Sequence, residues 1–464
     1  MDPRLIDSST SPVASVSPSA STSAPAASRH AWYAVAILTL ANVSGFIDRQ
    51  ILAPLVEPIR RDLQISDTQI SLLGGLGFAL FYSVLGIPIG RWVDRGHRPR
   101  IVALGVAVWS LLTALSASAR SFGQLFLARI GVGVGEATLG PAAVSLIAEQ
   151  FPRQRLGIAM STYMVGTFAG SGLAYAIGAY LVQALDRPGY VTLPLIGDVH
   201  PWQTVFLWVG LPGLFIALFA LTMREPRLAA DRARRTQEPP FADVLRYVRT
   251  HARTIGGLSM GYALSASVNY GIAFWLAAFL IRTHGWTVGQ AGLLQGVLTS
   301  TLGVAGVLFG GRLTDRWNAR GMVDAPLRVG MLGAVGMLVC AGLYPVMPNA
   351  TWTVVLLLPV NVFATMPWGA ANAAIAEAMP SHMRGQGSAI YQLVVNLVSG
   401  VLGPTAVAVV TDTVFGDPQA LGWSLSLNAV FGMSAVLALL AWTRPAYRAT
   451  VERVRAAEGD TAAR

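Results

Sequence analysis

Twelve apolar segments, each long enough to cross a lipid bilayer, dominate this sequence. A helix rises about 1.5 Å per residue, so about 20 apolar residues span the hydrocarbon core. Only 12% of the 464 residues are charged, which is about half the share typical of soluble domains. Because lipid offers the backbone no hydrogen bonds, each isolated segment must be helical. The segments are residues 31–56, 68–91, 100–119, 122–149, 156–184, 203–223, 254–281, 287–312, 325–346, 352–379, 385–411 and 420–443.

The last six segments repeat the first six. GRWVDR at residues 90–95 matches GRLTDR at residues 311–316, and Gln69 aligns with Gln290 at the same offset of 221 residues. Parallel repeats of six helices are typical of transporters that bind their substrate between the two halves. We therefore predict an all-α polytopic membrane protein with twelve transmembrane helices in two pseudo-symmetric six-helix bundles, residues 30–223 and 254–444.

The remaining segments are polar. Residues 1–29 are rich in Ser, Ala and Pro and are expected to form a disordered cytoplasmic tail. Residues 445–464 are read as a second cytoplasmic tail. The linker 224–253 places apolar residues at helical spacing over 241–248, which predicts either a short amphipathic helix on the membrane or a plain solvated connector. Arginines concentrate in alternate loops, so both termini should face the cytoplasm, most simply across a bacterial inner membrane.

The turn after residues 68–91 resembles the loop motif of the major facilitator superfamily, with His97 where a glycine is usual. This resemblance implies the twelve-helix fold, a path between the halves and helices at 31–56 and 122–149 that line it. The charges around the turn could form a cytoplasmic latch in which Arg95 or Arg98 pairs with Glu149, or they could only set topology. The latch and its second-half copy would comprise Asp94, Arg95, Arg98 and Glu149, with Asp315, Arg316 and Glu377.

A narrower resemblance is to the Spinster family of sphingolipid and lysophospholipid transporters. It is carried by NVSGFIDRQILAPL at 42–55, SDTQISLL at 66–73, FLARIGVGVGEA at 126–137 and the stretch 141–152. These lie in the first 180 residues, so the second half supports only the superfamily. The resemblance implies a bacterial member that carries an amphiphile or an organic anion.

Four charged residues stand inside the predicted membrane segments: Asp48, Arg49, Arg129 and Glu136. A charge at the centre of a bilayer costs at least about 2.5–3.5 kcal/mol, so such residues are functional candidates. Burial favours the protonated form of a carboxyl group, whereas a nearby arginine favours the ionised form. We predict that Glu136 carries a proton with Asp48 as its partner, and that Arg49 and Arg129 act as switching counter-charges. Alternatively, an arginine holds an anionic group of the substrate, or the set is a static ion pair.

The matching positions in the second half are uncharged, since Asn269 and Tyr270 stand where the first half has Asp48 and Arg49. The second half should therefore contribute apolar and hydrogen-bonding contacts, which suit an amphiphile or an aromatic acid better than a sugar. Each candidate could instead serve helix packing. The candidate substrate-binding residues are Arg49, Asn269, Tyr270, Asn361, Trp368, Asn372 and Tyr391, together with Asn396.

The sequence shows no HExxH, GxSxG, Walker A or Cys/His cluster, which argues against an enzyme or a metal site. We predict a proton-coupled secondary transporter for a small amphiphilic or anionic molecule. It would need no cofactor beyond the proton gradient, bind no nucleic acid, contact membrane lipids and act as a monomer. Two alternatives stay open: a proton symporter for uptake of an organic or aromatic acid, and a non-transporting sensor with a carrier fold.

Overall fold

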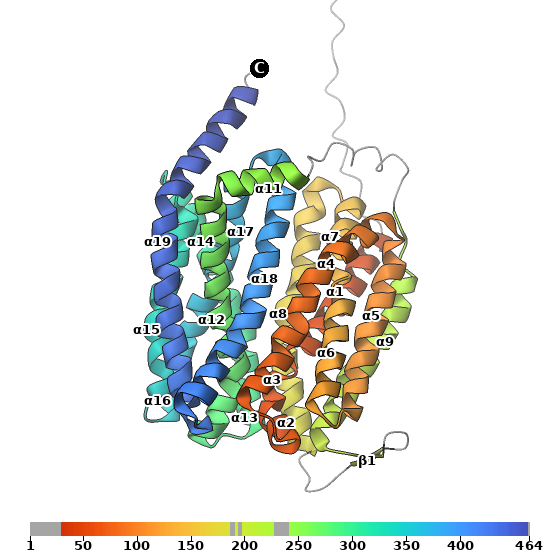
Figure 1. The fold of residues 1–464 in the computed structure, drawn as a ribbon. Coiled ribbons are helices and arrows are strands. Elements are labelled where there is room, and N and C mark those ends of the chain that lie inside the picture. Colours follow the sequence, from red (N-terminus) through yellow and green to blue (C-terminus); the bar gives the residue numbers. More distant parts are fainter. Residues whose placement is uncertain (1–28, 186–190, 194–196, 227–240, 463–464) are drawn as a thin grey trace, which may run out of the picture.

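The computed structural model describes residues 29–185, 191–193, 197–226 and 241–462. Residues 1–28 of the predicted disordered tail and residues 227–240 of the linker therefore lie outside the described residues. Eleven helical stretches among the described residues are long and apolar enough to cross a membrane. A further 33-residue helix, α8 (Arg153–Leu185), runs along α1 (Arg29–Gln50) and completes the twelve (Figure 1).

The first half contains six membrane-crossing stretches, several of them broken by short turns. It consists of α1, η1 (Ala53–Leu55), α2 (Val56–Leu63), α3 (Asp67–Gly74), α4 (Leu76–Arg95), α5 (Arg98–Leu115), η2 (Ser116–Ser118), α6 (Phe122–Glu136), α7 (Leu139–Gln150), α8 and α9 (Pro201–Leu221). An antiparallel hairpin of β1 (Val191–Leu193) and β2 (Gly197–Val199) precedes α9 and is the one addition to the all-α prediction within the described residues.

The second half repeats this plan after the linker helix α11 (Phe241–Thr250). It consists of α12 (Ala252–His284), α13 (Val288–Leu298), η4 (Thr299–Gly303), α14 (Val304–Ala319), α15 (Ala325–Leu343), η5 (Tyr344–Val346), α16 (Ala350–Thr365), α17 (Pro367–Ala378), η6 (Ser381–Met383), α18 (Arg384–Val409), η7 (Val410–Phe415), η8 (Pro418–Ala420) and α19 (Leu421–Ala462).

The repeat noted in the sequence has a local physical cause at the second crossing of each half. Ser66 and Gln69 form a capping box at the start of α3, and Thr287 and Gln290 form the same box at the start of α13. In each box the cap side chain accepts the backbone N–H of the glutamine, and the glutamine side chain accepts that of the cap residue. The matching glutamines therefore fix where these two helices begin.

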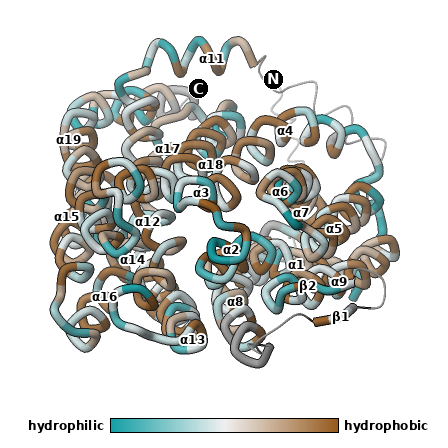
Figure 2. The backbone as a smooth tube through the Cα atoms, turned by 60° about the horizontal axis from the view of Figure 1, so that its bottom comes forward, coloured by the Kyte–Doolittle hydropathy of each residue, from teal (hydrophilic) through white to brown (hydrophobic). Residues whose placement is uncertain are grey.

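The two ends of the bundle differ in how closely the halves meet. We call the end that carries α11 and the C-terminus the α11 face, and the end that carries α2 and the hairpin the α2 face (Figure 1). One buried apolar cluster joins Leu55, Ile59 and Trp202 of the first half to the second half. A separate cluster, which includes Leu38, Trp109 and Leu146, holds the first half together alone. Figure 2 looks onto the α2 face, where hydrophilic α2 lies between the halves.

The halves cross through glycines at two places. A Cβ on Gly75 would lie 2.5 Å from the backbone oxygen of Gly400, at the junction of α3 and α4 with α18. A Cβ on Gly296 of α13 would lie 2.9 Å from the backbone oxygen of Gly172 on α8. Small residues allow helix backbones in a membrane to approach closely. At these two crossings the halves therefore meet through direct backbone packing.

The last helix is longer than the sequence predicts. We expected a tail after residue 444, but α19 continues through Pro445 to Ala462. Tyr447 and Val451 of this extension are fully buried, and the Thr254 and Thr450 hydroxyls lie 2.9 Å apart. Pro445 removes one backbone donor, and Arg253 donates to the nearby carbonyl of Trp442. Packing against the bundle therefore stabilises the helix beyond the proline.

The linker also contains a helix. Of the two structures considered for it, the amphipathic helix is present as α11, and its Val244 side chain is fully buried.

The Gly75 crossing provides a stability test. Gly75→Ala should lower the free energy of unfolding by about 1–3 kcal/mol, because the new methyl group meets the rigid Gly400 carbonyl. Thermal unfolding of the purified protein measures this effect. Gly86→Ala on the same membrane crossing is the matched control, since nothing lies within 4 Å of its added Cβ. Equal melting temperatures for the two variants would contradict the tight crossing.

Candidate functional site

The four charged residues predicted in the membrane segments lie together. The last turn of α1 supplies Asp48 and Arg49, and α6 supplies Arg129 and Glu136. Arg49 Nε donates to Glu136 Oε2 at 2.5 Å, and Arg129 Nη1 donates to the backbone oxygen of Asp48 at 2.9 Å. Asp48, Arg129 and Glu136 are at most 3% exposed. Gly45 has no side chain to occupy the space beside the Glu136 carboxylate.

Within this cluster, Arg49 is the counter-charge that pairs directly with Glu136. Neither carboxylate oxygen of Asp48 has a hydrogen bond, and the nearby Thr113 hydroxyl faces it without hydrogen-bond geometry. Nε and Nη2 of Arg129 are likewise buried without partners among the described residues. The cluster is balanced in charge but incompletely hydrogen-bonded.

Arg49 is surrounded by aromatic rings. Its guanidinium carbon lies 5.0 Å from the ring centre of Phe46, 4.7 Å from that of Phe78 and 4.6 Å from that of Tyr82. A desolvated cation–π contact of this kind contributes up to about 2 kcal/mol. The group also borders a cavity of about 30 Å³ that Tyr270 helps to line. Glu136 is its only hydrogen-bond partner in the described structure, so other guanidinium N–H groups are available to a ligand.

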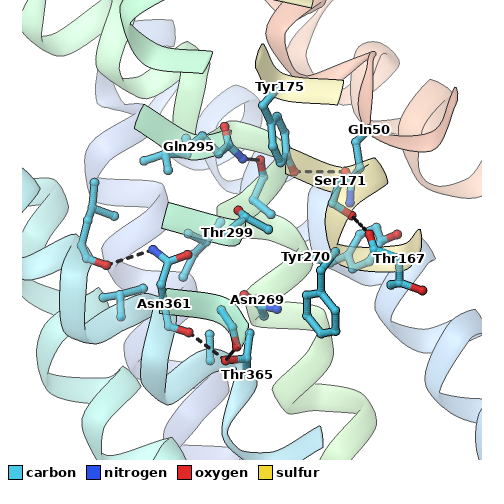
Figure 3. A pocket seen from close by; sticks show the side chains of 18 of the residues that line it. Gln50, Thr167, Ser171, Tyr175, Asn269, Tyr270, Gln295, Thr299, Asn361 and Thr365 are labelled. Carbon is cyan, nitrogen blue, oxygen red and sulfur yellow. Dashed lines mark hydrogen bonds between the residues drawn. The ribbon is translucent and has the colours of Figure 1, made fainter. Parts of the chain in front are cut away.

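Some second-half candidates line a cavity between the halves and others do not. Asn269, Tyr270, Asn361 and Trp368 border a cavity of about 100 Å³ (Figure 3). Asn396 lines the small cavity beside Arg49. The remaining two positions border none of these cavities. Tyr391 is buried in the hydrophobic core, and exposed Asn372 accepts a hydrogen bond from Gln392.

Sequence reasoning missed more than half of this cavity's polar wall. Its further polar side chains come from α1, α8, α13, α16 and η4, a π-helical turn that widens the backbone. Such turns are frequent at functional sites. The amides at 50 and 295 could have been found as polar residues inside apolar segments, whereas the π-helical turn has no sequence signature. The missed residues are Gln50, Thr167, Ser171, Tyr175, Gln295, Thr299 and Thr365.

A larger cavity of about 540 Å³ lies toward the α11 face, between α4 and α18. Tyr82 and Asn396 line both this cavity and the small one beside Arg49. Tyr270 in turn lines both the small cavity and the 100 Å³ cavity. The three spaces therefore adjoin one another in a series, and Arg49 lines the middle one. Among the described residues, no group of three His, Cys, Asp or Glu side chains is placed to hold a metal ion.

On the α11 face, Arg98 joins helices of the first half through ion pairs. Its guanidinium pairs with Glu149 at 2.5 Å, as the latch requires, and also with Glu225 after α9, which the sequence analysis missed. Arg98 is fully buried, so it holds together the ends of three helices. Arg95 is exposed and makes no ion pair among the described residues, and the side chain of Asp94 lies outside the described part.

The second half does not copy this latch. Exposed Asp315 and Arg316 form no ion pair within the described part of the chain, and Glu377 pairs with Arg455 at 3.2 Å instead. The reason is the extension of α19, which brings Arg455 to the end of α17. Asp324, fully buried at the start of α15, accepts hydrogen bonds from Arg328 and Arg444. In the first half a buried arginine lies between two carboxylates, whereas here a buried carboxylate lies between two arginines.

On the α2 face, charged residues connect the halves directly. Arg282 at the end of α12 donates to both carboxylate oxygens of Asp67, at 2.6 and 2.8 Å, and to Glu57 at 2.6 Å. Asp412 accepts hydrogen bonds from the backbone and hydroxyl of Thr68, both at 2.7 Å. The sequence analysis treated Arg282 only as a topology signal. These contacts close the α2 face, whereas the large cavity lies toward the other face.

Comparison with known proteins agrees with this architecture. The family model described as Major Facilitator Superfamily matches residues 38–404. An MFS-type efflux pump of Mycolicibacterium smegmatis is 30% identical over 416 residues, which cover 89% of this chain and 92% of the pump. A probable L-galactonate transporter of Escherichia coli is 26% identical, covering 75% of this chain and 76% of that protein. The crystal structure of a bacterial homologue of the human lysosomal transporter Spinster, inward-facing and occupied, has a TM-score of 0.74 at 25% identity, covering 92% and 97%.

The Asp324 cluster generates a pH prediction. Burial acts to raise the pKa of Asp324, but hydrogen bonds from Arg444 and Arg328 outweigh it and hold the pKa below its usual value. A lowered folded-state pKa stabilises the fold above the unfolded-state pKa of about 3.9, and this contribution is lost as the pH falls through the lower folded value. Asp324→Asn should therefore cost about 1–3 kcal/mol at neutral pH.

Thermal unfolding across a pH series measures this cost. The gap between wild type and Asp324→Asn should be equal at pH 8 and pH 5 and should shrink only below about pH 4. Asp315→Asn, an exposed carboxylate without an ion pair in the described structure, should leave stability unchanged. A gap that closed between pH 8 and pH 5 would contradict the lowered pKa.

Proposed function

Because the chain belongs to the Major Facilitator Superfamily and is a multi-pass membrane secondary transporter, not an enzyme, we propose that it moves a small organic anion together with a proton. The observation that carries this proposal is the buried ion pair of Arg49 and Glu136 beside a cavity. Breaking a buried pair by removing one partner costs about 3–5 kcal/mol. Any event that separates the two groups must therefore neutralise the one left behind.

An anion that enters the small cavity competes with Glu136 for Arg49. Guanidinium binds carboxylate and phosphate groups with paired N–H donors, and Arg49 uses only Nε for Glu136. Once the anion takes Arg49, protonation of Glu136 removes its uncompensated charge. Anion and proton are then held at the same time, which favours movement of both in the same direction. Arg129 and Asp48 complete the charge balance around the pair.

A lysolipid-like amphiphile is the second candidate substrate. The cavity of about 540 Å³ toward the α11 face is bordered by Ile87, Phe241, Ile390 and Leu393, an apolar wall that suits a hydrocarbon chain. The Spinster resemblance of the first 180 residues implies the same class, and the fold is similar to that of the occupied Spinster homologue. A non-transporting sensor with this fold would bind a ligand without producing flux, so flux measurements separate it from both transport candidates.

We infer that the α11 face is the cytoplasmic one and that the protein resides in a bacterial inner membrane. Arginine is concentrated in the loops of this face, as positive-inside topology requires. The large cavity lies toward the same face, which agrees with an inward-facing conformation like that of the Spinster homologue. Protease protection of a C-terminal tag in oriented vesicles would test the assignment.

Proton coupling is tested with purified protein in liposomes that contain the pH dye pyranine. External gluconate, benzenesulfonate or lysophosphatidylcholine is added, and acidification of the lumen reports proton entry with the anion. Wild type should acidify the lumen with at least one probe. Glu136→Gln should abolish this signal while retaining exchange of the same labelled anion across the membrane, because the neutral amide mimics the protonated carboxyl.

Glu452→Gln is the matched control, since Glu452 is an exposed carboxylate on the extension of α19. It should acidify the lumen as the wild type does. Proton entry that survived in Glu136→Gln would remove Glu136 from the coupling role. Anion flux in wild type with no proton entry would reject proton coupling altogether.

A further inference from the structure

The 100 Å³ cavity has amide side chains whose orientation is fixed by the backbone. Gln295 Nε2 donates to the carbonyl of Ala273 at 2.5 Å, and Asn361 Nδ2 donates to the carbonyl of Leu357 at 2.9 Å. A backbone carbonyl only accepts, so each amide must direct its nitrogen there and keep its oxygen free. Gln295 is 3% exposed, and its Oε1 has no hydrogen-bond partner in the described structure.

The hydroxyl groups of the same wall are oriented in a similar way. Ser171 donates to the carbonyl of Thr167 at 2.8 Å, and Thr365 donates to that of Gly303 at 2.8 Å. A hydroxyl that already donates its single proton can only accept a hydrogen bond from a ligand. Figure 3 shows these side chains around one space, contributed by both halves. At these four side chains the wall presents acceptors, so a ligand that binds them must supply donors.

Because the wall is uncharged, it favours neutral hydrogen-bond donors over charged ones. No acidic or basic side chain borders this cavity among the described residues. An ammonium group buried there would lose its hydration without gaining a counter-charge, which is costly. Hydroxyl groups supply donors without that cost. Tyr270 borders both this cavity and the smaller one beside the Arg49 guanidinium, so the two spaces adjoin at its side chain.

We propose that the substrate is a small polyhydroxylated organic acid, whose carboxylate binds Arg49 and whose hydroxyls donate to Gln295 Oε1 and Asn361 Oδ1. This inference rests on the proposed transport of an organic anion and names its chemical class.

Calorimetric titration of the purified full-length protein tests the class. The probes are gluconate, glycerate and glucuronate, compared with hexanoate, sorbitol and 6-aminohexanoate. At least one hydroxy acid should bind about tenfold more tightly than hexanoate, which has the charge without the donors. Sorbitol, which has the donors without the charge, should bind more weakly than gluconate. Tightest binding by hexanoate or by 6-aminohexanoate would overturn the proposal.

Two variants locate the hydroxyl contacts. Gln295→Leu and Asn361→Leu should each weaken binding of the best hydroxy acid about fivefold to tenfold and leave hexanoate within about twofold. Asn372→Leu is the matched control, because this exposed amide borders none of the three cavities. Unliganded melting temperatures verify folding. Equal weakening for hydroxy acid and hexanoate would reject these contacts.

The binding and proton-flux experiments test the substrate class and the proton coupling separately, so either proposal can fail without the other. If a hydroxy acid binds as expected but causes no acidification in pyranine-loaded liposomes, the coupling proposal falls and the substrate class stands. If lysophosphatidylcholine or benzenesulfonate drives proton entry while all three hydroxy acids fail to bind, the class is wrong and coupling stands.

Discussion

The ion pair between Arg49 and Glu136 is the constraint on which the rest of the structure depends. In a bundle surrounded by hydrocarbon, neither charge can be left alone at acceptable cost. The fold meets this demand with Gly45 beside the carboxylate, three aromatic rings around the guanidinium and Arg129 bound to the adjoining backbone. The protein therefore places a balanced pair of opposite charges beside the middle one of its three cavities.

Charge is distributed differently at the two ends of the molecule. On the α2 face, Arg282 and Asp67 join one half to the other, and a shared apolar core lies behind them. On the α11 face, Arg98 and Asp324 each tie helices within a single half. Ion pairs between halves hold the path closed, whereas ion pairs within a half keep that half rigid while it moves. The arrangement matches what alternating access requires of a carrier.

Much of the fold follows from the sequence, because segment length, the internal repeat and the loop arginines are local signals. The charged cluster could also be predicted from the sequence, since charged residues inside apolar segments are rare. The pair of Arg98 with Glu149 was predicted and is present. Other pairings could not be predicted, because Glu377 meets Arg455 only where α19 continues and Glu225 reaches Arg98 from beyond the end of α9. Amides proved hardest to assign, as Asn361 and Asn372 look alike in sequence while only Asn361 borders a cavity.

The glycine crossings of Gly75 with Gly400 and of Gly172 with Gly296 have a mechanical consequence. Each brings backbone against backbone, so at these two contacts no interlocking side chains must be unpacked when one half turns against the other. Together the two crossings define an axis between the halves, and rotation about it needs only small shifts at either contact. The barrier to switching then lies in the contacts that join the halves on the α2 face, such as the ion pair of Arg282 with Asp67.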